Sequence, residues 1–133
     1  MKIIKTDNSL NLIFRNKIHT NTFRYVLKDN TIKESIKTVL NIPIELVEFY
    51  KLNEHKYIYF NHKEGSQVLN YCGVGSEKNE DYINLNITNS KGRYYRLTLT
   101  KELVKEFNIN SNMKGVFKFS YRGNDVFLSL YFE

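Results

Sequence analysis

The chain has 133 residues, of which 41% are hydrophobic and 26% charged, so it is long enough for one compact unit or two small halves that share a core. Its formal net charge is +6, its single cysteine, Cys72, excludes an internal disulfide, and no apolar run approaches the roughly 20 residues that cross a bilayer. Because the first residues also lack the apolar core of a signal peptide, we expect a cytoplasmic protein.

Residues 1–27 predict an N-terminal strand arm. Leu10, Leu12 and Phe14 alternate with polar residues, which is the period of a strand with one buried face. We expect this strand to pair with residues 25–27 or with the edge of the segment that follows. Residues 28–40 then fit a hairpin that turns at Asp29-Asn30, although residues 33–39 also fit a short helix.

Residues 42–53 predict a helix, and a strand pair follows it at 57–60 and 68–71. Pro43 suits the first helical position, where its missing N–H costs nothing. Residues 72–81 contain two glycines and a run of charges without an apolar period, so they predict a linker.

Residues 82–133 predict a hairpin, a helix and a second hairpin. Apolar and polar residues alternate over 83–87 and 95–99, and the turn at 89–92 ends in a glycine that can adopt positive φ. Thr100 suits the N-cap of the helix, which is followed by strands over 116–121 and 126–132.

The helix segment occurs twice. Residues 42–53 align without a gap with residues 99–110, and the apolar positions coincide as Leu46/Leu103, Val47/Val104, Tyr50/Phe107 and Leu52/Ile109. The sequence therefore predicts a first repeat over 28–71, a linker over 72–81 and a second repeat over 82–133. The predicted fold class is mostly β with short α-helices (α+β).

In this order of elements the chain resembles the swapped-hairpin family of the AbrB and MazE type. The resemblance lies in Lys91-Gly92-Arg93, in the strand-to-helix run 97–104 and in Gly123-Asn124-Asp125-Val126. It implies two swapped-hairpin β-α-β units interlocked into one barrel-like pseudo-dimer that binds double-stranded DNA. Two tandem copies can bury each other's apolar faces, so we expect that a monomer can fold, while an exposed strand edge still allows a homodimer.

Positive charge is concentrated outside the first helix and its strand pair. Residues 1–41 carry eight Lys or Arg against three acids, residues 42–80 four against six, and residues 81–133 eight against five. Such a surface binds nucleic acid by releasing phosphate counterions. Charge and resemblance together give six candidate DNA-binding residues: Lys91, Arg93, Arg96, Asn89, Lys33 and Lys37.

Neighbouring residues leave alternatives open. Tyr94 and Tyr95 suit stacking on unpaired bases, but strand alternation favours one ring in the core and the other in solvent. Asn84, Asn86 and Asn89 suit hydrogen bonds to adenine edges.

Enzymatic signals are weak. The three histidines, His19, His55 and His62, lack metal-ligand spacing, and the chain has neither a phosphate-binding glycine loop nor a serine elbow. Glu-His-Lys at 54–56 matches half of a nuclease site but has no suitable upstream aspartate.

We therefore expect no catalysis, cofactor or metal. The leading hypothesis is a DNA-binding transcriptional regulator or antitoxin-like factor. The alternatives are a small phage- or plasmid-encoded protein that binds and inhibits a host enzyme on the same scaffold, and a binder of single-stranded nucleic acid.

Overall fold

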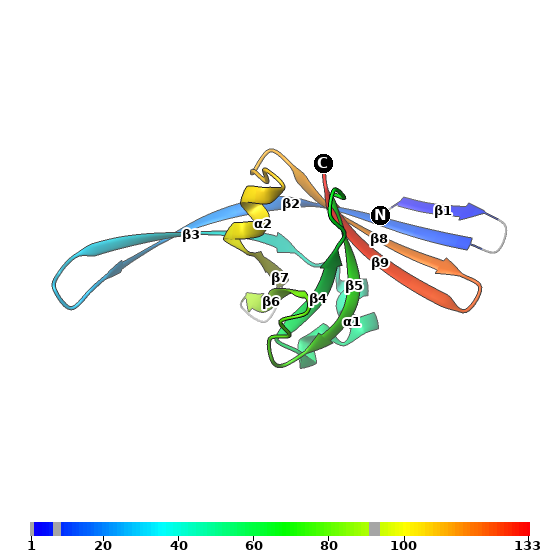
Figure 1. Ribbon diagram of the computed structural model, residues 1–133, viewed down its shortest axis with the longest axis horizontal. Coiled ribbons are helices and arrows are strands. Elements are labelled where there is room, and N and C mark those ends of the chain that lie inside the picture. The colour runs from blue at the N-terminus through cyan, green and yellow to red at the C-terminus, as the bar shows by residue number, and fades with distance from the viewer. Residues whose placement is uncertain (1, 7–8, 91–93) are drawn as a thin grey trace.

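The computed structural model describes residues 2–6, 9–90 and 94–133, and within these ranges the chain forms nine β-strands and two short α-helices (Figure 1). The strands are β1 (Lys2–Thr6), β2 (Ser9–Val26), β3 (Ile32–Asn41), β4 (Tyr57–His62), β5 (Val68–Gly75), β6 (Ile83–Ser90), β7 (Tyr94–Leu99), β8 (Lys114–Arg122) and β9 (Asp125–Phe132). The helices are α1 (Ile44–Tyr50) and α2 (Lys101–Glu106), and a 3-10 turn, η1 (Leu52–Glu54), follows α1. The protein is mostly β, as predicted.

Eight of the described strands close into an antiparallel barrel in the order β2-β3-β7-β6-β4-β5-β9-β8, and β8 pairs back onto β2. Strand β1 adds to the N-terminal half of β2. Residues 9–17 of β2 pair with β8, so the prediction that residues 10–14 pair with residues 25–27 or with the first repeat was wrong. Tyr25 pairs instead with Lys33 across the β2–β3 turn.

The β2–β3 turn lies at Asp29 and Asn30, as predicted. The backbone N–H of Thr31 donates to an Asp29 carboxylate oxygen at 3.0 Å, and Asn30 adopts a left-handed φ of 66°. Residues 33–39 belong to β3, so the alternative of a helix there was wrong. Strand β5 continues to Gly75, so residues 72–75 of the predicted linker belong to a strand. The connection between β5 and β6 is residues 76–82.

The core fills the barrel and extends beneath both helices. Leu40, Leu97 and Phe60 are fully buried inside the barrel. Helix α2 begins as predicted, because the Thr100 side chain accepts a hydrogen bond from the Leu103 N–H at 3.2 Å. In α1, Pro43 is the N-cap rather than the first helical residue, one position earlier than predicted.

The two halves of the chain share one order and one pairing scheme. Each half has an opening hairpin (β2–β3 or β6–β7), a helix, and a closing hairpin (β4–β5 or β8–β9). Strand β4 pairs with β6, and β8 pairs with β2, so each closing hairpin joins the opening hairpin of the other half. Leu46 and Leu103, which the sequence alignment matches, are each 3% exposed.

Candidate nucleic-acid interface

The two opening hairpins lie side by side because β3 pairs with β7. Cross-strand partners share a face of a sheet, so the register defines rows across the four strands. One row, Ile18, Leu40, Leu97 and Ile87, is buried in the core. The next row, His19, Val39, Thr98 and Asn86, lies on the opposite, outer side of these strands, where Asn86 is exposed but Val39 is only 5% exposed.

We call this outer surface the basic face. Its members alternate with the core residues along each strand, and β2 and β3 carry it beyond the barrel. They are Lys17, His19, Asn21, Phe23 and Tyr25 on β2; Lys33, Ser35, Lys37, Val39 and Asn41 on β3; Asn86 and Thr88 on β6; and Tyr94, Arg96 and Thr98 on β7.

The charge of the basic face has one sign. Lys17, Lys33, Lys37 and Arg96 are its cations, and among its described residues there is no Asp or Glu. The three lysines are exposed, while Arg96 is half-buried. A surface of this kind attracts a polyanion. Beyond Lys17 on the same side of β2, Arg15 is ion-paired with Glu133 at 2.7 Å, so we place the edge of the basic face at Lys17.

Arg96 is held at the junction of the two hairpins. Its Nε donates to Asn41 Oδ1 at 3.0 Å, and the Asn41 backbone carbonyl accepts a bond from Asn16 Nδ2 at 2.6 Å. Thr88 pairs with Arg96 on the other side. The hydrogen bond to Asn41 directs the guanidinium toward this junction and leaves its two terminal nitrogens for a ligand.

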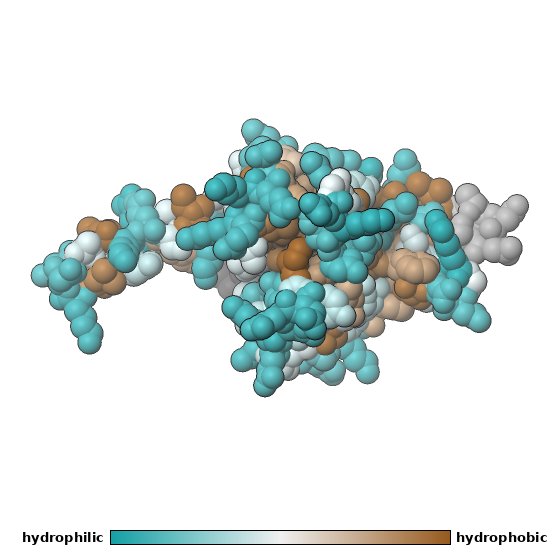
Figure 2. All heavy atoms as spheres, in the orientation of Figure 1, coloured by the Kyte–Doolittle hydropathy of each residue, from teal (hydrophilic) through white to brown (hydrophobic). Residues whose placement is uncertain are grey.

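The rest of the basic face lies on a projecting two-stranded arm, residues 20–38 of β2, its turn and β3, which extends to the left in Figure 1. No described residue from 20 to 38 is buried, so the arm contributes nothing to the core. On the basic face of the arm, Lys37 Nζ lies 5.3 Å from the centre of the Phe23 ring. Figure 2 shows hydrophobic residues between hydrophilic ones along this arm.

The structure brings some predicted residues together and separates others. Lys33, Lys37 and Arg96 share the basic face. Asn89 lies in β6 rather than in a turn, and it pairs with Tyr95 on the opposite face from Arg96. Lys91 and Arg93 lie outside the described residues.

The structure also shows where the neighbouring tyrosine and asparagine side chains lie. Tyr94 is exposed and Tyr95 packs against the core, which confirms the alternation favoured from the sequence. Asn84 holds the 76–82 connection, because its Nδ2 donates to the Asn79 and Tyr82 carbonyls at 2.7 and 2.9 Å. Asn86 is exposed on the basic face.

Sequence reasoning missed Lys17, Phe23 and Tyr25. The signal was present, because odd-numbered positions from 17 to 25 are occupied by Lys, His, Asn, Phe and Tyr. The even-numbered positions from 20 to 26 also include polar residues, so no buried side of the predicted strand arm showed which residues share a face.

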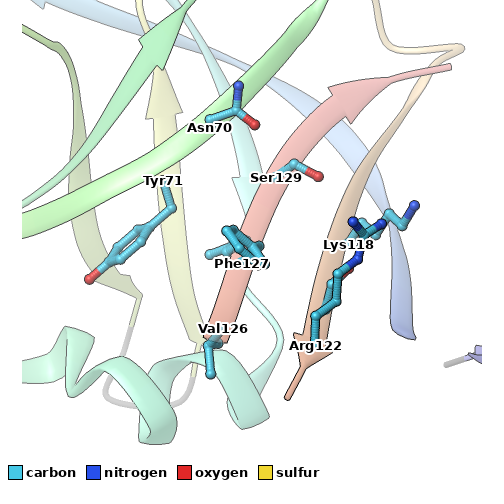
Figure 3. Close-up of a pocket in the computed structure, with 9 residues that line it drawn as sticks. Asn70, Tyr71, Lys118, Arg122, Val126, Phe127 and Ser129 are labelled. Carbon is cyan, nitrogen blue, oxygen red and sulfur yellow. The ribbon is translucent and has the colours of Figure 1, made fainter. Parts of the chain in front are cut away.

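A second concave surface lies where β5 pairs with β9, across the barrel from the β3–β7 junction. It has a volume of about 310 Å³, and Figure 3 shows Lys118 and Arg122 on one side, Tyr71 on the other and Phe127 between them. Burial raises the pKa of Tyr71 above its ordinary value. This groove is separate from the basic face.

His62 lies in structural surroundings, whereas His19 belongs to the basic face. The His62 ring packs edge-on against Phe107 at 5.0 Å, and a ring nitrogen is hydrogen-bonded to the Ser66 carbonyl. Among the residues that the structure describes, no three His, Cys, Asp or Glu side chains gather as metal ligands would. No helix in the described part of the chain is long and apolar enough to cross a membrane.

No family model, curated protein or solved structure matches the chain. The geometry and charge of its own surfaces are therefore the basis for inferring function.

Proposed function

We propose that the protein is a DNA-binding transcriptional regulator or antitoxin-like factor, without catalysis, built from two swapped-hairpin units interlocked within one chain. Its binding surface is the basic face, and its ligand is double-stranded DNA.

The interlocked arrangement is supported by the packing of each helix. Tyr50 of the first half contacts the Phe119 ring of the second half with a centroid distance of 6.3 Å. The matching residue at the C-terminal end of α2 is the C-cap Phe107, whose ring lies 5.0 Å from that of His62 in the first half. Each helix also contacts the closing hairpin of its own half, since Tyr50 lies 4.4 Å from Tyr71 and Phe107 lies 6.1 Å from Phe132. Both helices therefore pack across the line where the two halves meet, as interlocked units would.

The strand pairing supports a pseudo-two-fold relation as well. Leu40 pairs with Leu97, and the ungapped repeat alignment, continued two residues, makes these two residues equivalent. An axis relating the halves then passes between them. The order of elements and this relation agree with the resemblance to the AbrB and MazE type.

The single observation that carries the DNA hypothesis is the joined, acid-free surface of the two opening hairpins. Lys33, Lys37 and Lys17 can neutralise phosphates, and Arg96, already oriented by Asn41, can contact a phosphate or a guanine edge. The first hairpin is longer than the second, so binding is asymmetric and weighted toward the arm.

The test is fluorescence anisotropy of a labelled random-sequence duplex at low salt, repeated over a salt series. Wild-type protein should bind, and its affinity should fall steeply as salt rises. The Lys33→Ala/Lys37→Ala variant should bind roughly tenfold more weakly, with a salt slope lower by about one for each phosphate that the variant no longer neutralises.

The matched control is Lys63→Ala/Lys78→Ala, which removes the same charge from exposed positions outside the basic face. This control should retain most of the affinity. Absence of duplex binding at tens of micromolar protein, or equal weakening by both double variants, rules out the basic face as a DNA site.

The Arg96→Ala variant tests whether Arg96 contacts a base edge or a phosphate. If it contacts a base edge, Arg96→Ala should cost about 1–3 kcal/mol and relax specificity at that base pair. If it contacts a phosphate, the decrease in affinity should be uniform across sequences.

The second candidate function is binding and inhibition of a host enzyme by this same scaffold. The exposed aliphatic residues Val26, Ile32 and Ile36 on the arm favour it. A complex of that kind should tolerate salt that dissociates a DNA complex. Parallel titration with single-stranded oligonucleotide tests the third hypothesis, which was based on stacking by Tyr94 and Tyr95; Tyr94 is exposed, and the exposed rings of Phe23 and Tyr25 lie on the same face.

A further inference from the structure

The face of the arm opposite to the basic face, which we call the apolar arm face, carries three exposed aliphatic side chains among threonines and one ion pair. Val26 and Ile32 pair with each other, and Ile36 follows on the same face of β3; they are 66%, 66% and 58% exposed. The only charges between them, Arg24 and Glu34, form an ion pair at 2.8 Å, so they largely cancel. Side chains this apolar, aligned on one face, mark an interaction surface.

This apolar face continues into a groove at the base of the arm. The groove has a volume of about 250 Å³ and lies between β3, β7 and α2. Leu99 and Val104 form its apolar floor, and Lys101 and Lys105 are its exposed cations. The groove thus has an apolar floor and a basic rim, so it fits a segment that carries both apolar and acidic side chains.

The chain itself carries such a segment. The outward side of α1 presents two apolar and two acidic side chains: Ile44, Glu45, Glu48 and Phe49. Their spacing places them along one side of the helix, opposite to the buried pair Leu46 and Val47. Ile44 is 54% and Phe49 is 49% exposed, although Phe49 also contacts Phe119.

Within one molecule these two surfaces do not meet, because α1 packs on β8 through Phe119 whereas the groove lies against α2. A second copy can supply the missing partner. If the α1 of each copy docks in the groove of the other, the two contacts are identical and the assembly closes with two-fold symmetry.

We infer that two copies of the chain form a closed dimer in which the outer side of α1 in each copy docks against the apolar arm face and the groove of the other. Glu45 and Glu48 then lie against Lys101 and Lys105, and Ile44 and Phe49 cover Ile36 and the groove. The dimer leaves the basic face of each arm exposed, so it does not depend on DNA binding.

The test is sedimentation velocity of the full chain from about 1 to 200 μM. Wild-type protein should pass reversibly from the 15.8 kDa monomer to a dimer as concentration rises. Lys101→Glu/Lys105→Glu makes the groove and α1 both acidic, and Glu45→Lys/Glu48→Lys makes both basic. Each variant alone should dimerise at least roughly tenfold more weakly.

Mixing the two variants is the decisive step. In the mixed dimer, an acidic groove meets a basic α1 at one contact and a basic groove meets an acidic α1 at the other, so association should return. A contact with any other acidic protein would not be restored in this way.

The control is Lys63→Glu/Lys78→Glu, which changes the net charge by the same amount as the groove variant and should dimerise like wild type. All four residues changed in α1 and the groove are exposed, and circular dichroism checks that each variant is folded. A wild-type chain that stays monomeric at 200 μM overturns the inference. So does growth beyond a dimer, or a mixture that associates no better than its components.

Discussion

Replacing Gly115 by alanine tests how tightly the barrel is filled. Gly115 faces the interior on β8, and a Cβ atom built there would lie 2.4 and 2.6 Å from the two methyl carbons of Leu40 and 3.1 Å from its Cγ. Leu40 is fully buried and pairs with Leu97 at the centre of the barrel wall. One of the two side chains must therefore move, in a place where neighbouring atoms leave little room.

The expected cost follows from two opposing terms. Overpacking of a filled core costs about 1–3 kcal/mol. The loss of glycine's conformational freedom in the unfolded chain returns about 0.4–1 kcal/mol. Gly115→Ala should thus lower the free energy of unfolding by about 1–2 kcal/mol, while Leu40→Ala alone should lower it by about 2–5 kcal/mol because it leaves a cavity.

The double variant provides the internal control. With Leu40 shortened to alanine, the new Cβ at position 115 occupies vacated space, so the double variant should be more stable than the sum of the single losses by about 1–3 kcal/mol. Urea unfolding followed by far-UV circular dichroism measures all four chains, since the protein has no tryptophan. Additive losses would show that Leu40 does not occupy the space in front of Gly115.

Three further outcomes are expected. Thr100→Ala should lower the free energy of unfolding by about 1 kcal/mol in urea, because the Leu103 N–H loses its acceptor, whereas Thr100→Ser should be close to wild type. Burial raises the pKa of Tyr50, so as pH rises the tyrosine of the unfolded chain ionises first, and the free energy of unfolding should decline above about pH 10. The free energy of unfolding of Tyr50→Phe should decline less over the same range. An equal decline in both chains would show that Tyr50 is not its cause. The hydrogen bond from Thr31 lowers the pKa of Asp29, so the turn should keep this hydrogen bond until the pH falls below about 4. An NMR titration of the Asp29 carboxyl group with a midpoint at or above the usual value for aspartate would contradict this.

Much of the fold was predictable because its signals are local. The alternation over 83–87 and 95–99, the N-cap at Thr100 and the apolar helix positions all follow from the period of one element. The repeat added more, since matching Leu46 with Leu103 predicted that both are buried. Pro43 was misplaced by one residue because proline suits both of the positions where a helix begins.

The pairing partners of β2 were not predictable from local pattern. Residues 10–14 have the alternation of any half-buried strand, and nothing in it identifies a partner more than a hundred residues away. The arm was ambiguous for a different reason. Both of its faces are exposed, so residues 33–39 carry no burial period that could separate a strand from a helix.

The candidate site was only partly predictable. Lys33, Lys37 and Arg96 were chosen for charge, but the surface that they share exists because β3 pairs with β7. Asn89 was chosen as a turn residue, and it lies on the opposite face because β6 is longer than the alternation indicated. Side-chain direction at the end of a strand depends on where pairing stops, which the sequence does not encode locally.

The seam that closes the barrel has a consequence for synthesis of the chain. Asn11 of β2 and Ser120 of β8, joined by a hydrogen bond at 2.6 Å, are 109 positions apart. At about 5–20 residues per second, the ribosome delivers β8 roughly 5–20 s after β2. During that interval this edge of β2 has no native partner strand, and β4 and β5 likewise wait for β6 and β9. The barrel can therefore close only after nearly the whole chain has emerged, and the nascent chain needs protection from strand-edge aggregation until then.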